Sequence, residues 1–439
     1  MSLAHQSTDA RRLIRGIGPW ALTAFALNLT VGAGILGLPA RLQALVGNYS
    51  IVVIGICGLV IMLIALCFAE IGSRFDRTGG PQLYASIAFG PGVGFAVGWL
   101  LWLSRLGTCA AVSNLLIDYG TILVPRLAQP VARVGIISML VLVYTWINMR
   151  GIRQTAAVSI AFTVAKLVPL ITFAIVGMFY IDPQLIQFGP LPPITNASNA
   201  ILLAGFAYFG FDATTVLAGE VRAAPRSVPF AIVLSVCTVI LLYSLIQMVC
   251  VGTLPNLAAA ERPLADAAAV LVGPGASVAV ALTAVVACAG VFGASMTPGT
   301  RLLFAMAEQR QLPAVLAHVH ARFSTPGVAI LVTAVAAWIL AVSGSFIYLV
   351  KVTLIARVSV YAITCVTLPN FRCRTDLAAA AFKVPAGPIV AYGCAILCLL
   401  SLANSSMREL LDVALAALLG LTLFGFTRFA HRAPIAPIT

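Results

Sequence analysis

The first long apolar segment of this chain is interrupted by glycine, and the interruption limits what the chain can fold into. The segment spans Asn28–Pro39 and reads NLTVGAGILGLP. In a helix interior Gly costs about 1 kcal/mol and Pro about 3 kcal/mol relative to Ala. Non-helical backbone at membrane depth survives only inside protein or beside a wet cavity, because hydrocarbon offers its polar groups no water. The segment therefore predicts either a broken membrane helix beside a cavity or close helix packing through small residues.

A later apolar segment, Phe206–Asp212, carries a second break and reads FAYFGFD. Glycine-interrupted segments at corresponding places in two halves of a chain are the best sequence sign of a transporter's binding site. N–H groups freed at the first break suit a carboxylate, and carbonyls freed at the second suit an ammonium group. Phe206 or Tyr208 would act as a lid, or the aromatics simply pack against lipid or core. Asp212 is a candidate binding residue, because acids inside membranes are costly, or a structural partner for a hydroxyl or arginine.

The composition places the chain in a membrane. Of its 439 residues 61% are hydrophobic and 9% are charged, and the mean hydropathy is +1.06, whereas a soluble domain has about 25% charged residues. A crossing helix needs about 20 apolar residues, and the chain holds about twelve such stretches. The predicted spans are 17–41, 49–72, 90–123, 134–149, 155–180, 198–219, 228–253, 272–306, 327–343, 345–368, 384–402 and 408–429.

The positive charges predict the orientation and exclude nucleic-acid binding, because they lie between the apolar stretches and favour one side. On that side are sixteen: Arg11, Arg12, Arg15, Arg74, Arg77, Arg150, Arg153, Arg222, Arg226, Arg310, Arg322, Arg372, Arg374, Lys383, Arg428 and Arg432. On the other are five: Arg41, Arg126, Arg133, Arg262 and Arg408. We therefore expect a multi-pass protein of the cell inner membrane with both termini in the cytoplasm.

The two breaks also predict an internal repeat. Predicted spans one to five and six to ten each begin with a glycine-broken helix, and an odd number of spans makes the two copies inverted relative to each other. The expected organisation is a tail at 1–16, a transporter core at 17–368, two additional spans at 384–429 and a tail at 430–439. Within the core we expect one repeat at about 17–180 and the other at about 198–368.

Several cations lie within predicted spans. Lys166 is eleven residues into the fifth span, ~16 Å along a helix and so near the middle of the bilayer. A buried ammonium can lose its proton, so Lys166 is predicted to couple transport to protons or to remain a charged strut. Arg105 is expected to face the pathway and pair with Asp212 or substrate, or to snorkel to an interface. Lys351 and Arg357 lie on different faces of the tenth span, so at most one faces the cavity.

Charged residues also end several spans on the predicted cytoplasmic side, where they would latch an inner gate or form a solvated rim. They are Glu70, Arg74, Arg77, Glu220, Arg222 and Arg226. Nine of the ten cysteines lie in apolar runs, as small buried thiols do. The sequence contains no metal-ligand cluster and no catalytic Ser/His/Asp or Cys/His set. We therefore expect no metal, no cofactor and no enzymatic activity.

With these residues in view, the chain resembles the amino acid–polyamine–organocation superfamily of permeases over nearly its whole length. Four segments carry the resemblance: NLTVGAGILGLP at Asn28–Pro39, the stretch Ala69–Arg105, FAYFGFDATTVLAGEVRAAPRSVP at Phe206–Pro229 and TRLLFAMAEQRQLP at Thr300–Pro313. The resemblance implies an all-α membrane protein with a leucine-transporter-type fold of five-plus-five inverted repeats, in which helices one and six are broken.

The resemblance also implies roles for residues. Backbone N–H groups around Val31, Gly32, Ala33 and Gly34 would hold a substrate carboxylate. Carbonyls of Phe206, Ala207 and Phe209 would hold the ammonium group, with Asp212 nearby, Phe206 or Tyr208 as gate, and Arg105 and Ser295 as possible pocket residues. Lys166 matches a lysine that replaces a sodium ion in proton-coupled members and in exchangers alike.

The sequence thus predicts a secondary active transporter that moves an amino acid or close amine by alternating access, coupled to protons, as a monomer or homodimer. We favour a substrate with a neutral side chain. Arg105 would repel a cationic ligand if it faces the pocket, whereas Asp212 would attract one. Two alternatives remain. One is obligate exchange of amino acids or polyamines, and the other is a transporter-like sensor that binds its ligand without moving it.

Overall fold

The computed structural model describes residues 13–32, 34–273, 275–343, 346–403 and 406–430. Ala33, predicted as a carboxylate-binding residue, lies outside these ranges, and so do the side chains of Phe206 and Lys351. The described residues form helices and no β-strand, apart from one isolated parallel bridge between Ile17 and Val221.

The α-helices follow one another along the chain, several of them joined by short 3₁₀ turns. The first eight are α1 (Pro19–Thr30), α2 (Gly34–Val46), α3 (Ser50–Gly72), α4 (Pro81–Phe89), α5 (Pro91–Leu123), α6 (Pro130–Arg150), α7 (Ile152–Gly177) and α8 (Ile194–Ala207). The others are α9 (Ala213–Val216), α10 (Ala224–Thr253), α11 (Pro263–Val272), α12 (Ala276–Glu308), α13 (Gly327–Val342), α14 (Phe346–Cys373), α15 (Gly387–Ala403) and α16 (Met407–Ala430). Short 3₁₀ turns are η1 (Gly47–Tyr49), η2 (Pro125–Ala128), η3 (Met178–Tyr180), η4 (Pro183–Leu185), η5 (Ala218–Glu220), η6 (Leu257–Ala259) and η7 (Ala314–Ala317).

Proline and glycine set many of these boundaries. Pro81, Pro91, Pro130 and Pro263 each open a helix, where the missing N–H costs no hydrogen bond and φ is already helical. The two helices α4 and α11 lie between predicted spans and are additions to the predicted pattern.

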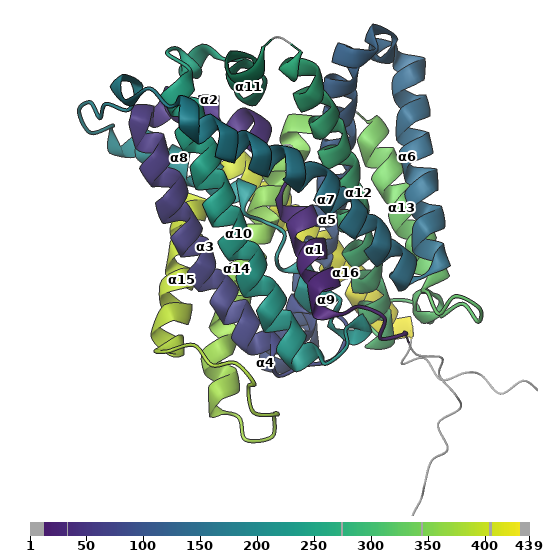
Figure 1. The fold of residues 1–439 in the computed structure, drawn as a ribbon. Helices are drawn as coiled ribbons and strands as arrows, with labels where there is room; N and C mark the ends of the chain where they lie inside the picture. Colours follow the sequence, from purple (N-terminus) through teal and green to yellow (C-terminus); the bar gives the residue numbers. More distant parts are fainter. Residues whose placement is uncertain (1–12, 33, 274, 344–345, 404–405, 431–439) are drawn as a thin grey trace, which may run out of the picture.

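The long helices pack side by side into one bundle (Figure 1). The central helix is α5, which contacts α12, α14, α13 and α4. In its most apolar stretch 78% of the residues are buried, against 17% for α6 and 11% for α16. The inner and outer positions in the bundle therefore differ sharply in how much of each helix faces outward.

Eight helical stretches among the described residues are long and apolar enough to cross a membrane. They are Gly34–Gly72, Pro91–Leu123, Pro130–Arg150, Ile152–Tyr180, Ala224–Thr253, Val278–Glu308, Thr353–Cys373 and Met407–Thr427. The sequence predicts about twelve spans, and the lower number of long apolar helices has a physical reason. The first and sixth predicted spans are interrupted, and α13 and α15 have 16 and 17 residues, which is short of the ~20 of a straight crossing.

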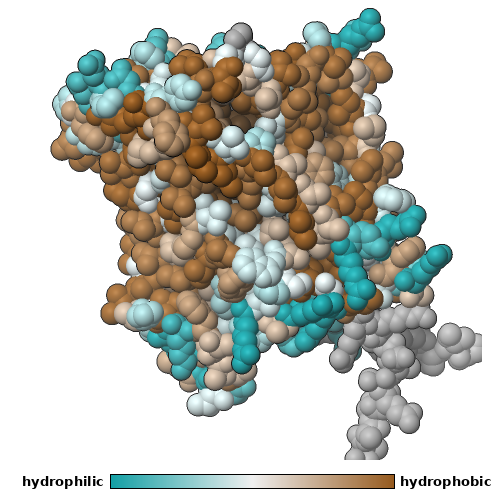
Figure 2. Space-filling model, viewed as in Figure 1, coloured by the Kyte–Doolittle hydropathy of each residue, from teal (hydrophilic) through white to brown (hydrophobic). Residues whose placement is uncertain are grey.

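The outer surface suits hydrocarbon. Figure 2 shows hydrophobic residues over the middle of one face and hydrophilic groups toward its two ends. Large apolar side chains point outward from the peripheral helices, among them Leu142 and Trp146 of α6 and Leu415 and Leu418 of α16. In water such a continuous apolar surface would be an aggregation liability, whereas in a bilayer it is solvated by lipid tails. The chain is a multi-pass membrane protein.

Candidate functional site

The helix interruptions lie where the glycine patterns predict them. The first helix ends at Thr30 and the next begins at Gly34. The second interruption separates α8, which ends at Ala207, from the single turn of α9, which begins at Ala213. The last helical bond before the first break runs from Val31 N to Leu27 O at 2.8 Å.

The two interruptions touch, although about 180 residues of sequence separate them. Gly210 has φ +147°, and a Cβ atom built on it would lie 2.6 Å from Thr30 Oγ1 and 2.8 Å from Thr30 N. The approach is therefore possible only without a side chain at 210. Tyr243 of α10 donates its hydroxyl hydrogen to Thr30 O at 3.1 Å, so a carbonyl at the end of α1 has a partner away from water.

A buried ion pair lies at the end of the second break, at Asp212, the residue before α9. Asp212 accepts hydrogen bonds from Arg105 Nη2 of α5 and, at 2.8 Å, from the Tyr361 hydroxyl of α14. All three side chains are buried. Ser295 of α12 donates to the carbonyl of Arg105 at 3.2 Å. The predicted residues Arg105, Asp212 and Ser295 thus meet, and the alternative in which Arg105 snorkels to an interface is wrong.

Phe209 brings a second arginine into this cluster. The ring of Phe209 lies 5.2 Å from that of Tyr361, and the guanidinium carbon of Arg357 lies 5.8 Å from the Phe209 ring centroid. Arg357 Nε donates to Ser104 Oγ at 3.1 Å and Nη2 to Thr108 Oγ1 at 3.4 Å. Sequence reasoning leaves the choice between Arg357 and Lys351 open and misses Tyr361. The available signal is the four-residue spacing of Arg357 and Tyr361, which puts both on one face of a helix.

Lys166 lies on another side of the first break. Its ammonium group donates to the carbonyl of Asn28, two residues before the end of α1. The Asn28 amide nitrogen donates in turn to Ser159 Oγ of α7 at 3.0 Å and to Gly290 O of α12 at 3.1 Å. A cavity of about 10 Å³ borders Asn28 and Ser159, which is room for about one water molecule. Lys166 therefore ties α7 to α1 beside the break, and the Asn28 side chain extends the connection to α12.

Tyr208 lies apart from the Asp212 cluster. Its hydroxyl donates to Ile54 O of α3 at 3.0 Å, and its ring centroid lies 5.4 Å from that of Tyr243. Its side chain is buried and contacts α3 and α10 through these two groups. The backbone of Phe206 and Ala207 forms the end of α8, whereas Val31 and Gly32 form the bend after α1.

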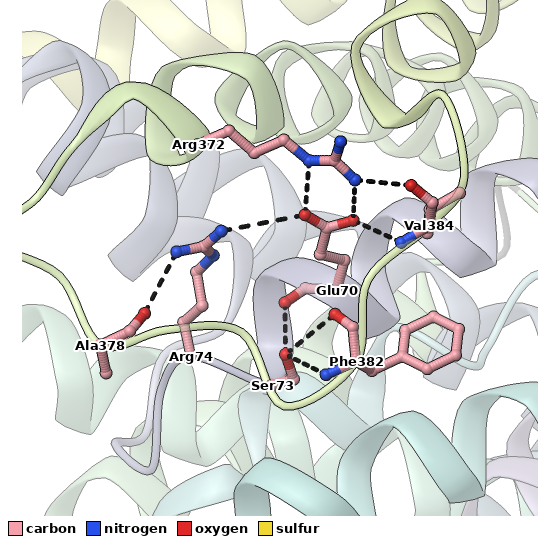
Figure 3. Close-up of polar contacts among 7 residues, drawn as sticks. All are labelled: Glu70, Ser73, Arg74, Arg372, Ala378, Phe382 and Val384. Carbon is pink, nitrogen blue, oxygen red and sulfur yellow. Dashed lines mark hydrogen bonds and ion pairs between the residues drawn. The ribbon is translucent and has the colours of Figure 1, made fainter.

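A buried carboxylate also fixes the far end of α14. Glu70 of α3 accepts from Arg372 Nε at 2.7 Å, from Arg372 Nη2 at 2.6 Å and from Val384 N at 2.7 Å (Figure 3). Arg74 Nη2 lies 3.8 Å from Glu70 Oε1, and Arg74 Nη1 donates to Ala378 O at 3.1 Å. Burial lowers the pKa of the Arg74 guanidinium, and Glu70 partly offsets this. We call this group the Glu70 clamp, because it joins α3, α14 and the loop after α14.

A second ion pair, between Glu220 and Arg301, is buried as well; Glu220 is another of the acids predicted at the cytoplasmic ends of spans. Arg301 of α12 donates from Nε and Nη2 to both carboxylate oxygens of Glu220, at 3.0 and 3.1 Å. Both side chains are almost completely buried. Glu70 and Glu220 therefore do not belong to a solvated rim. Arg222 instead donates from Nε to the carbonyl of Arg15 at 3.4 Å.

The model of a family described as amino acid permease matches residues 17–424. The methylthioribose transporter of Bacillus subtilis is 27% identical over 424 residues, covering 91% of this chain and 90% of its own length. The branched-chain amino acid permease BcaP of the same organism is 24% identical over 95% of this chain and 94% of its own. The BcaP of Lactococcus lactis is 27% identical, with 84% of each chain covered.

The contact between the breaks yields a first prediction. Gly210→Ala should destabilise the protein by about 1–3 kcal/mol, because the new Cβ meets backbone atoms and the residue keeps a strained φ. Thermal unfolding of the purified protein in detergent measures this. The matched control is Gly205→Ala, five residues earlier, where an added Cβ would be 3.6 Å from Cys57 Sγ, an ordinary contact. Equal unfolding temperatures for the two variants would contradict the tight contact.

The Glu70 clamp yields a second prediction. Glu70→Gln removes the charge that compensates Arg372 and should destabilise the protein by about 3 kcal/mol. The control is Asp376→Asn, which removes a carboxylate from an exposed ion pair with Arg374 and should leave the unfolding temperature nearly unchanged. Loss of stability in the control but not in Glu70→Gln would show that the clamp contributes nothing.

Proposed function

The chain belongs to the amino acid permease family, and on that premise we propose that it is a secondary active transporter that moves an amino acid across the cell inner membrane by alternating access. The observation that carries the proposal is the contact of Gly210 with Thr30. It brings two interrupted membrane helices together beside buried polar groups. Backbone of this kind at membrane depth is the usual material of a transporter's binding site.

The proposed architecture has about twelve spans. In it, α1 with α2 forms the first span and α8 with α9 the sixth, each broken in the middle. The two inverted repeats occupy about 17–180 and 198–368, the two spans at 384–429 are additions, and the tails at 1–16 and 430–439 lie in the cytoplasm. The excess of Lys and Arg on one side supports this orientation.

The proposed ligand site lies between the breaks. N–H groups of Val31, Gly32, Ala33 and Gly34 hold the substrate carboxylate, since α2 begins at Gly34 and a helix N-terminus attracts anions. Carbonyls of Phe206, Ala207 and Phe209 hold the ammonium group, with Phe206 as the gate. Tyr208 is the weaker gate candidate, because its hydroxyl and ring are already engaged. The preference for a neutral side chain rests on Arg105 and Asp212, and these two neutralise each other.

Proton coupling is assigned to Lys166. The group is fully buried, and its hydrogen bond to Asn28 O ties it to the end of the broken helix α1. A change in its charge would therefore act directly on the segment that holds the substrate. Obligate exchange is the second candidate, in which Lys166 remains charged and the strut moves only with substrate bound.

Lys166→Ala should abolish uptake driven by an imposed pH gradient in proteoliposomes, because the group that takes up the proton is gone. The matched control is Lys383→Ala, which removes an exposed lysine of a loop and should leave uptake unchanged. If substrate accumulation by the wild-type protein does not depend on the pH gradient, and efflux requires external substrate, then proton coupling is wrong and obligate exchange is the function.

Gly34→Leu should abolish amino acid binding without unfolding the protein. A Cβ at Gly34 has no heavy atom within 4 Å, so a side chain fits there, but it occupies the space in front of the proposed carboxylate site. Ligand-induced thermal stabilisation measures the loss, because a ligand of the native state raises its apparent stability. Gly55→Leu in α3, also without a contact within 4 Å, is the control. Retained stabilisation in Gly34→Leu would refute the backbone site.

A further inference from the structure

The buried charges of the described residues do not balance. Three acids are fully buried, and each has an arginine partner: Glu70 with Arg372, Asp212 with Arg105, and Glu220 with Arg301. Two further buried cations, Lys166 and Arg357, have no carboxylate within ion-pair distance in the part of the chain that the structure describes. No fully buried acid among the described residues is left over for either of them, and Asp412 of α16, a half-buried residue whose Oδ2 has no hydrogen-bond partner, forms no ion pair with either cation.

The two remaining cations differ in chemistry. Lys166 can become neutral by losing its proton, and a buried lysine does so readily. Arg357 cannot, because a guanidinium stays protonated under all conditions met by proteins. Within the described residues its side chain contacts two hydroxyls and the face of the Phe209 ring, and none of these carries a compensating charge. A permanent cation inside a membrane protein is costly and normally faces a partner or a pathway.

Unused hydrogen-bond donors lie in the same place. Arg105 is buried and pairs with Asp212 through Nη2, but its Nε and Nη1 have no partner. Arg357 donates to Ser104, the residue next to Arg105. The two arginines and Tyr361 surround Asp212 and Phe209, at the second helix break. Buried donors of native proteins are nearly always satisfied, so this cluster lacks an acceptor as well as a negative charge.

We propose that the substrate carries a net negative charge, as an amino acid with an acidic side chain whose carboxylate accepts hydrogen bonds from Arg357 and from the unused donors of Arg105. A zwitterion adds no net charge and leaves the excess as it was, whereas a ligand of charge −1 cancels it. A guanidinium also matches a carboxylate in geometry, with two parallel hydrogen bonds. This inference rests on the proposed function and changes its preference from a neutral to an acidic side chain.

The test compares ligands of equal shape and different charge. Binding to the purified full chain is measured as thermal stabilisation, and uptake is measured in proteoliposomes. In both assays L-aspartate is compared with L-asparagine, and L-glutamate with L-glutamine. The acid of each pair should bind about tenfold or more tightly than the amide, because the amide leaves Arg357 uncompensated. Acetate and chloride serve as probes for a site that takes any small anion.

Variants of Arg357 locate the effect. Arg357→Gln should weaken binding of the acids by about a hundredfold and spare the amides, whereas Arg357→Lys should keep the preference for acids at lower affinity. The control is Arg408→Gln, which removes an exposed arginine at the start of α16. If Arg357→Gln fails to fold, the acid-to-amide ratio of the wild-type protein decides alone.

Each of three results would overturn the inference and leave the transporter standing. The first is that amides or other neutral amino acids bind as tightly as the acids, and the second is an acid-to-amide ratio that Arg357→Gln does not change. Binding of acetate or chloride equal to that of the acidic amino acids would also overturn it. If no amino acid of either charge binds or moves, the proposed function itself fails, and the inference fails with it.

Discussion

The structure depends on a contact between backbone and backbone. Gly210 lies against Thr30 so closely that a methyl group would not fit between them. Both residues stand at helix interruptions, where peptide groups lose their helical partners, and a membrane provides no water to replace them. By packing the interruptions against each other and under the hydroxyl of Tyr243, the fold keeps them away from lipid. The polar cluster around Asp212 is built on this junction.

Ion pairs then fix the elements around the junction. Asp212 links the second break to α5 and α14, Glu220 links η5 to α12, and Glu70 links α3 to α14 and its following loop. Burying such pairs is expensive, and their Coulomb attraction roughly repays the desolvation only when the geometry is good. Their contribution is therefore better described as fixing which helices meet than as adding stability. Any opening of the bundle must carry these pairs along intact or break them.

The helix α14 connects the two polar regions. It carries Arg357 and Tyr361 at the junction and Arg372 in the Glu70 clamp. Tyr361 and Arg372 are eleven residues apart, which is ~16 Å along a helix. If the substrate binds beside Asp212, as proposed, α14 is the element that joins its site to the clamp, although Pro369 lies within the helix between Tyr361 and Arg372. The proposed alternating access would then couple the site to one end of the bundle through this helix.

The sequence by itself determined the membrane setting, the all-helical class and the place of both interruptions, because apolar length, glycine and proline act locally along the chain. It also singled out Arg105, Asp212 and Lys166, since charge inside an apolar run is conspicuous. Only the tertiary structure decided which of them meet. Four features depend on how α5, α14 and the second break pack: the pairing of Arg105 with Asp212, the hydrogen bond from Tyr361, the separation of Tyr208 from the cluster, and the lack of a carboxylate partner for Arg357 among the described residues. No local pattern encodes such contacts, because they join residues more than a hundred positions apart.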